Sequence, residues 1–235
     1  MADLEFPRKP LRLLCLHGHG GYGERMCKQL EDMFVKSLTI NNASAPNISC
    51  RCIDAPFPEN SRRALGRQWW RYDEDGFGNR PEDWSEMELA TTRIAQEIHE
   101  SGESYDGVVG FSQGAEMVHA LAVLSNREDP RMRGAAMPRF GISLSGAVNP
   151  GHFESQGGGG GPRDYAGPSF SLASTKLAMP CLFICDMFND GWYSTERLQE
   201  TFSMYSNATL LTHDQRHAVP SLDAQNASIL RDFLA

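Results

Sequence analysis

Short apolar runs alternate with amphipathic segments along the chain. Strand-length segments, several of them apolar at nearly every position, fall at 11–17, 49–54, 105–111, 140–144, 180–185 and 209–212. Helical patterns fall between them at 24–38, 113–124, 195–205 and 221–233, and a further helix is expected to begin at Ser85 and stop at Gly102. Because strands and helices alternate, the pattern predicts an α/β fold with a mainly parallel sheet and helices on both faces.

Two stretches interrupt this alternation. Residues 59–83 are irregular and rich in Arg, Trp, Gly and Asp, and residues 149–175 contain five consecutive glycines at 157–161. A glycine run cannot hold regular structure cheaply. Since strand patterns continue on both sides of it, we expect one domain over 1–235 with a Gly-rich insertion around 149–175.

Composition narrows the class of protein. The 235 residues are 40% hydrophobic, which is enough for one sizeable core. A net charge of -8 argues against a nucleic-acid binder. The acidic, non-apolar N-terminus and the shortness of the apolar runs lead us to expect a cytoplasmic protein without a signal or membrane segment. The spacing of the six cysteines favours free thiols and no metal site.

The strongest chemical signal is Gly110-Phe111-Ser112-Gln113-Gly114. It lies between a predicted strand and a predicted helix, which is the context of the Gly-X-Ser-X-Gly nucleophile elbow of α/β-hydrolases. In such an elbow the glycines make room for a tight turn that exposes the serine hydroxyl. A Ser helix cap is the simpler alternative. The two glycines and the strand–helix context favour Ser112 as a nucleophile.

A serine nucleophile needs a base, and in this fold the order along the chain is Ser, then Asp or Glu, then His. His217 lies in the loop between the last strand and the last helix, from which it can reach the serine. His119 lies within the helix after the elbow, His152 opens the Gly-rich insertion, and His213 ends a strand. We therefore predict His217 as the base.

The acid that orients this histidine should follow the preceding strand. Asp186 and Asp190 both qualify, and we prefer Asp190 because it lies a few residues into the loop. The oxyanion hole needs two backbone N–H donors. We assign these to Gln113, which follows the nucleophile, and to His19, in the loop after the first strand. That loop also matches Gly-X-Gly-X-X-Gly, but a dinucleotide site would leave the elbow and His217 unexplained.

Several stretches together resemble the FSH family of serine hydrolases, which includes the ovarian tumour-suppressor-candidate hydrolases. They are 16–18, 54–56, 69–72, 105–115, 143–146 and 217–220. The resemblance implies an esterase or thioesterase, and several fungal members release polyketides from an acyl carrier protein or hydrolyse a pathway intermediate. The family usually has Gly-X-X-Asp after the penultimate strand. Here an ungapped match places Asn189 on the acid, and Asp190 fits only after a one-residue shift.

These observations predict a serine hydrolase that cleaves an ester or thioester through an acyl-enzyme, and the resemblance to the FSH family implies a role in releasing or processing a polyketide. Its substrate would be a small acyl ester or a thioester on an acyl carrier protein, and no cofactor is expected. Trp69, Trp70 and Tyr72 are predicted either to line a substrate pocket or to anchor the core. The alternative function is a non-catalytic acyl- or partner-binding protein on a hydrolase scaffold.

Overall fold

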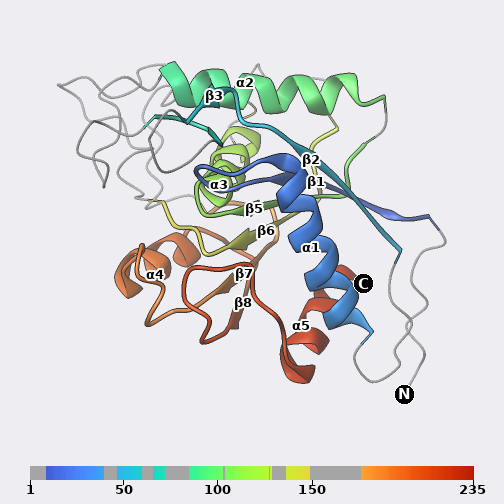
Figure 1. Ribbon diagram of the computed structural model, residues 1–235, viewed down its shortest axis with the longest axis vertical. Coiled ribbons are helices and arrows are strands. Elements are labelled where there is room, and N and C mark those ends of the chain that lie inside the picture. Colours follow the sequence, from blue (N-terminus) through green and yellow to red (C-terminus); the bar gives the residue numbers. More distant parts are fainter. Residues whose placement is uncertain are drawn as a thin grey trace.

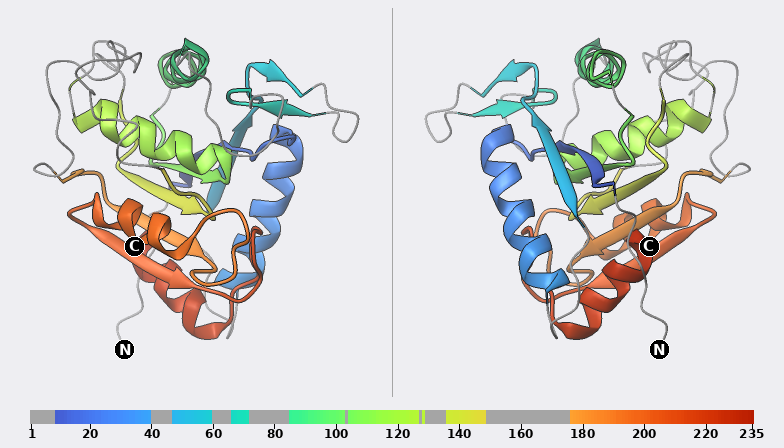
Figure 2. Two further views of the ribbon diagram at one scale, coloured as in Figure 1. Left: turned by 90° about the vertical axis from the view of Figure 1, so that its left-hand side faces the viewer. Right: turned by 90° about the vertical axis from the view of Figure 1, so that its right-hand side faces the viewer.

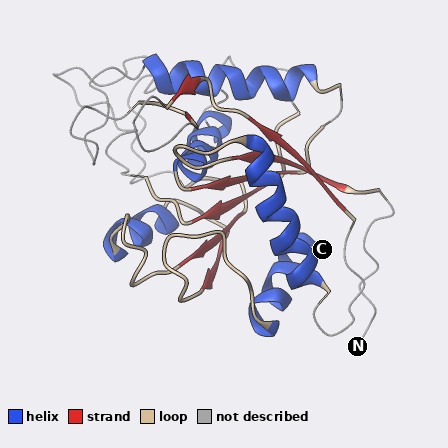
Figure 3. Ribbon diagram, in the orientation of Figure 1, coloured by secondary structure: helices blue, strands red, loops and turns tan. Residues whose placement is uncertain are grey.

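Six parallel strands form the central sheet of the computed structural model (Figures 1 and 3). The structure describes residues 9–39, 47–59, 66–71, 85–102, 104–126, 128, 136–148 and 176–235. The strands, in their order across the sheet, are β2 (Ile48–Ile53), β1 (Leu11–Leu16), β5 (Gly107–Phe111), β6 (Phe140–Leu144), β7 (Cys181–Cys185) and β8 (Ala208–Thr212). The Gly-rich insertion expected around 149–175 lies outside the described residues.

The order of the strands determines where a site can form. From β1 the chain moves outward to β2, then returns to β5 on the other side of β1 and continues outward to β8. The order therefore reverses between β1 and β5. In an open parallel sheet, ligands bind at the carboxyl ends of the strands beside such a reversal. The loop that carries His19 follows β1 and Ser112 follows β5, so the topology brings them to this point.

Helices cover both faces of the sheet, as Figure 2 shows. One face carries α1 (Gly23–Leu38) and α5 (Ala224–Leu234), and the other carries α2 (Ser85–Glu100), α3 (Gln113–Asn126) and α4 (Thr195–Ser203). The expected α/β architecture is therefore confirmed. Across the described ranges, no helix combines the length and apolar character needed to cross a bilayer.

Helix α3 is the central helix of its layer. Every residue from Gln113 to Leu124 is buried, because the helix lies between the sheet and α2. Burial on all sides explains why its sequence is apolar around most of its circumference. Helix α2 covers it from outside with Ile94, Ala95 and Ile98 buried, whereas Leu89, which shares the apolar spacing, is 56% exposed.

Two elements differ from the sequence-based expectations. The strands β3 (Phe57–Pro58) and β4 (Arg67–Gln68) pair antiparallel, and β4 lies within the stretch 59–83 that was expected to be irregular. Two-residue strands are too short to produce a periodic signal. Cys27 and Cys52 form a disulfide, so the expectation of six free thiols is wrong for this pair. Cys27 lies on α1 and Cys52 on β2, and only the packing of α1 against β2 brings them together.

The elbow glycines are required by a close approach of backbones. A Cβ on Gly110 would lie 2.2 Å from the carbonyl oxygen of Gly114, and a Cβ on Gly114 would lie 2.2 Å from that of Leu16. The start of α3 is therefore pressed directly against the ends of β5 and β1. No side chain fits in either place without moving the backbone.

We predict that Gly114→Ala lowers the free energy of unfolding by about 3 kcal/mol, because the methyl group collides with a backbone that cannot yield cheaply. Gly102→Ala is the control. It has open space and only a positive φ of 66° to oppose the substitution, so it should cost about 1 kcal/mol. Urea denaturation measures both. Equal losses in the two variants would contradict the steric argument.

Candidate active site

Ser112 lies at the turn between β5 and α3 with a φ of 52°, in the left-handed region that non-glycine residues rarely adopt. Its amide donates to the carbonyl of Leu144 at 2.9 Å. Its carbonyl accepts from the amides of Ala115 and Glu116 at 2.8 and 3.1 Å. Such a backbone conformation persists only where the surroundings enforce it. Here β6 and the first turn of α3 hold it.

His217 joins the serine to a carboxylate. Its Nε2 lies 2.8 Å from Ser112 Oγ, and its Nδ1 lies 3.0 and 3.1 Å from the two oxygens of Asp190. Because the carboxylate only accepts, Nδ1 carries the proton and Nε2 is left to accept from the serine hydroxyl. The structure thus brings together the three residues predicted as nucleophile, acid and base.

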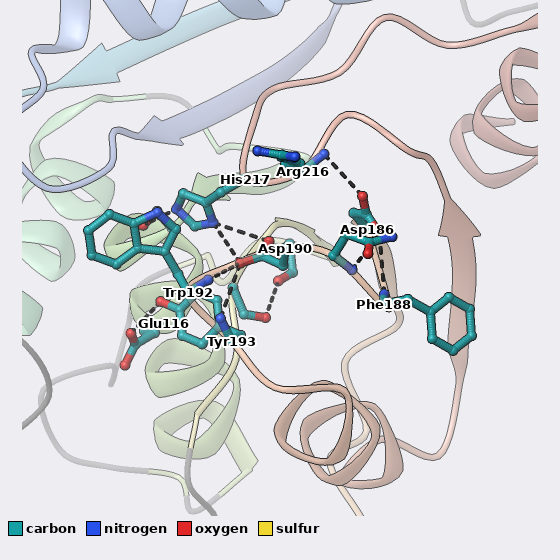
Figure 4. A network of polar contacts seen from close by, with 12 residues as sticks. Glu116, Asp186, Phe188, Asp190, Trp192, Tyr193, Arg216 and His217 are labelled. Atoms are coloured by element: carbon teal, nitrogen blue, oxygen red, sulfur yellow. Dashed lines mark hydrogen bonds and ion pairs between the residues drawn. The ribbon is translucent and has the colours of Figure 1, made fainter.

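Asp190 is held in place by its own loop. It is 3% exposed, and its Oδ1 accepts from the amides of Trp192 and Tyr193 at 3.1 and 3.2 Å (Figure 4). These donors compensate a buried carboxylate for the water that it has lost. The one-residue shift relative to the FSH pattern is therefore accommodated within the loop that follows β7.

Asp186, the alternative acid, has a different position. Its Oδ1 accepts from the amides of Phe188 and Asn189, and its Oδ2 accepts from the amide of Arg216 at 3.1 Å (Figure 4). Burial alone would raise the pKa of Asp186, but these backbone donors outweigh burial and hold it below its usual value. Asp186 therefore ties the loop that carries Asp190 to the residue preceding His217.

Three aromatic rings surround the imidazole of His217. The ring centroids of Phe111, Trp192 and Tyr193 lie 5.0, 5.7 and 5.8 Å from it. The hydroxyl of Tyr193 donates to Glu116 in the first turn of α3 at 2.7 Å. The loop after β7 is thereby tied to the first turn of α3, the helix that begins directly after Ser112.

The two segments that carry the predicted oxyanion donors come close to Ser112. Gln113 is the first residue of α3, so its amide has no acceptor within the helix. The loop after β1 reaches the serine at Gly18, where an added Cβ would lie 3.2 Å from Ser112 Cβ. The side chain of His19 faces Glu59 and Gln68, with its Nε2 at 2.6 and 3.2 Å from their oxygens. Both predicted donors therefore belong to backbone segments beside Ser112.

Trp69 and Trp70 support this loop from the core. They are 0% and 2% exposed, and the indole N–H of Trp69 donates to the carbonyl of His17 at 2.7 Å. The Gln113 side chain accepts from the amide of Trp69 and donates to the carbonyl of Trp70, both at 2.8 Å. Their burial favours core anchors over pocket walls and argues against the substrate-binding assignment. Tyr72 lies outside the described residues.

His17 is a structural residue that the sequence analysis did not assign. Its Nε2 accepts from the amide of Ala55 at 3.0 Å, and its Nδ1 donates to the carbonyl of Gly18 at 2.8 Å. Burial lowers the pKa of His17, which favours this neutral form. The imidazole thus links the loop after β1 to the loop after β2. The sequence signal that could have drawn attention to His17 is its place in the stretch 16–18, one of those that resemble the FSH family.

The other candidate bases have different surroundings. His119 is fully buried, with its nitrogens 2.7 Å from the hydroxyl of Tyr205 and 3.1 Å from that of Ser143. His213 accepts from the amide of Gln215 at its Nδ1. His152 lies outside the described residues. Among the candidates in the described part of the chain, His217 is the one bonded to Ser112.

The fold and this arrangement of side chains are those of an α/β-hydrolase with a serine-based site. A family model for serine hydrolases (FSH1) matches residues 6–229, and the chain belongs to that family of serine hydrolases. Esterase OVCA2 from Homo sapiens is 27% identical, and the match covers 95% of this chain and 96% of the relative.

Solved structures have the same fold at lower identity. Zea mays acyl-protein thioesterase 2 has a TM-score of 0.63 at 18% identity, covering 98% of this chain and 97% of its own. A Bacillus cereus carboxylesterase has a TM-score of 0.58 at 15% identity, covering 96% and 87%.

Because His119 is buried, we predict that the protein loses stability in acid. Burial lowers the pKa of His119 to about 3, whereas an unfolded histidine titrates near 6.5. Between these values the unfolded chain binds one more proton than the folded chain. The contribution of His119 to the free energy of unfolding should therefore fall by about 1.4 kcal/mol per pH unit as the pH drops below about 6.5.

Urea denaturation at about pH 7 and about pH 5 tests this in wild type and in His119→Phe. The variant lacks the hydrogen bonds of His119 and should be less stable than wild type at both pH values. The slope of its free energy of unfolding against pH should be smaller than that of wild type by the binding of one proton. His17 contributes in the same direction in both proteins, so a slope remains. Identical slopes would contradict the assignment.

Proposed function

We propose that this serine hydrolase cleaves an ester or thioester through an acyl-enzyme formed on Ser112. The observation that carries the proposal is the contact of His217 with both Ser112 and Asp190, at 2.8 and 3.0 Å. Nucleophile, base and orienting carboxylate must be joined in this way for a serine hydroxyl to attack a carbonyl at neutral pH.

In the first half-reaction, Ser112 Oγ attacks the carbonyl carbon while His217 Nε2 takes the hydroxyl proton. The negative charge that develops on the carbonyl oxygen is stabilised by the amides of Gln113 and His19. Collapse of the tetrahedral intermediate breaks the bond to the leaving group, which receives its proton from Nε2. Asp190 stabilises the imidazolium that exists between these proton transfers.

In the second half-reaction, His217 removes a proton from water, and the hydroxide that forms attacks the acyl carbon. The bond to Ser112 Oγ breaks, and Nε2 returns the proton to the serine. The products are a carboxylic acid and an alcohol or thiol. No cofactor is needed in this scheme, since every proton is exchanged among the substrate, water, Ser112 and His217.

The finer part of the proposal concerns the substrate. The resemblance to fungal members of the family supports a small acyl ester or an acyl carrier protein thioester, and a role in releasing or processing a polyketide. The competing hypothesis of a non-catalytic binder rested on the displaced acid. The contact of Asp190 with His217 supports the enzyme over the binder.

We expect Ser112→Ala to lower kcat for a 4-nitrophenyl ester by at least about 10⁴-fold, because no acyl-enzyme can form. Matched oxygen and thioesters of one acyl group, assayed with wild type, show which leaving atom is preferred. The circular dichroism spectrum of the variant controls for folding. Hydrolysis that persists in folded Ser112→Ala would rule out the mechanism.

Asp190→Asn and Asp186→Asn separate the two aspartates. An amide at 190 favours the wrong tautomer of His217, so kcat should fall by about 10⁴-fold. An amide at 186 keeps one acceptor oxygen and disturbs only the contact with the Arg216 amide, so kcat should fall on the order of tenfold. The reverse ranking in steady-state kinetics would assign the acid to Asp186.

A further inference from the structure

Trp192 is a large apolar side chain that the fold leaves open to solvent beside the site. It is 62% exposed, whereas Trp69 and Trp70 are 0% and 2% exposed. A single exposed apolar side chain is common on a protein surface, so the position of Trp192 beside His217 carries the argument and its exposure alone does not. The catalytic scheme above assigns Trp192 no role beyond the amide that it donates to Asp190.

The position of the indole relative to His217 is specific. The two ring centroids are 5.7 Å apart, with a 43° angle between the planes. In Figure 4 the indole lies beside the imidazole, on the side opposite Asp190. Because Nδ1 faces Asp190, the indole lies toward the edge that carries Nε2.

Its loop holds Trp192 in this place. The amide of Trp192 donates to Asp190 Oδ1 at 3.1 Å, and the preceding Gly191 takes a φ of 87° that permits the sharp turn. The next residue, Tyr193, is anchored to Glu116. The backbone that carries the indole is therefore held by Asp190 itself and by the neighbouring bond of Tyr193 to Glu116.

The proton transfer at His217 Nε2 indicates which part of the substrate lies next to this edge of the imidazole. Collapse of the tetrahedral intermediate requires Nε2 to protonate the leaving oxygen or sulfur, so that atom must come within hydrogen-bond distance of Nε2. The leaving group therefore extends past this edge of the imidazole. The acyl chain, on the other side of the carbonyl carbon, extends away from it.

We infer that Trp192 forms the binding surface for the leaving group and selects substrates whose alcohol or thiol portion is apolar and preferably flat. An indole face stacks on flat apolar groups, but it contributes little binding energy to a methyl group. The inference rests on the proposed function, since it assigns a role within the acylation step at Ser112. It makes Trp192 a specificity-determining residue.

The test uses methyl, benzyl and 2-naphthylmethyl esters of one acyl group, whose alcohols differ in apolar surface more than in acidity. In Trp192→Ala, kcat/KM should fall about tenfold for the naphthylmethyl ester and less than about twofold for the methyl ester. The rate of deacylation should not change, because the leaving group has departed by then. Trp192→Phe should retain most of the preference.

Phe188→Ala is the matched control. Phe188 lies on the same loop and is 81% exposed, but its ring points away from His217 in Figure 4. It should leave the ester series unchanged. A second control varies the length of the acyl group in a series of methyl esters, and Trp192→Ala should not alter that profile.

Three outcomes overturn the inference, and they are distinguishable. An equal loss for all three esters would make Trp192 a merely structural residue. A loss that follows acyl length, with slower deacylation, would place it against the acyl chain. Wild-type protein that hydrolyses none of the esters would overturn the proposed function itself, whereas hydrolysis with either of the first two results overturns only the role of Trp192.

Discussion

The structure depends on the left-handed backbone at Ser112, where the chain turns from β5 into α3 within one residue. The turn exists because Gly110 and Gly114 let the start of the helix touch the ends of β5 and β1. The strain of a non-glycine residue at positive φ costs about 1–2 kcal/mol. The buried α3 and its contacts with the sheet offset that cost and leave the hydroxyl projecting beyond the sheet.

The rest of the site is built around this fixed point by neighbouring strand ends. The loops after β7 and β8 bring Asp190 and His217 to Ser112, and Asp186 joins these loops through the amide of Arg216. On the other side, Trp69 and the Gln113 side chain hold the loop after β1 against the nucleophile. The core therefore positions a candidate site whose three central side chains, Ser112, Asp190 and His217, all lie on connections between elements.

Local sequence patterns predicted the sheet, the helices, and the elbow with His217, because each depends on neighbours in the chain or on chain order. The distinction between Asp190 and Asp186 depends on how the loop between β7 and α4 folds, which no spacing rule reveals. The burial of Trp69 and Trp70 and the pairing of Cys27 with Cys52 depend on contacts between distant segments. Trp192 belongs to no recognisable sequence motif, and only its position beside His217 in the structure suggests a role for it.

The central claim is that Ser112 is the activated nucleophile, and active-site mapping with a fluorophosphonate tests it most directly. The protein is treated with the probe, digested, and analysed by mass spectrometry. The account predicts one adduct, on the peptide that contains Ser112, and slower labelling when the substitution Asp190→Asn misorients His217. A folded protein that takes up no label, or takes it up at another serine, would contradict the account.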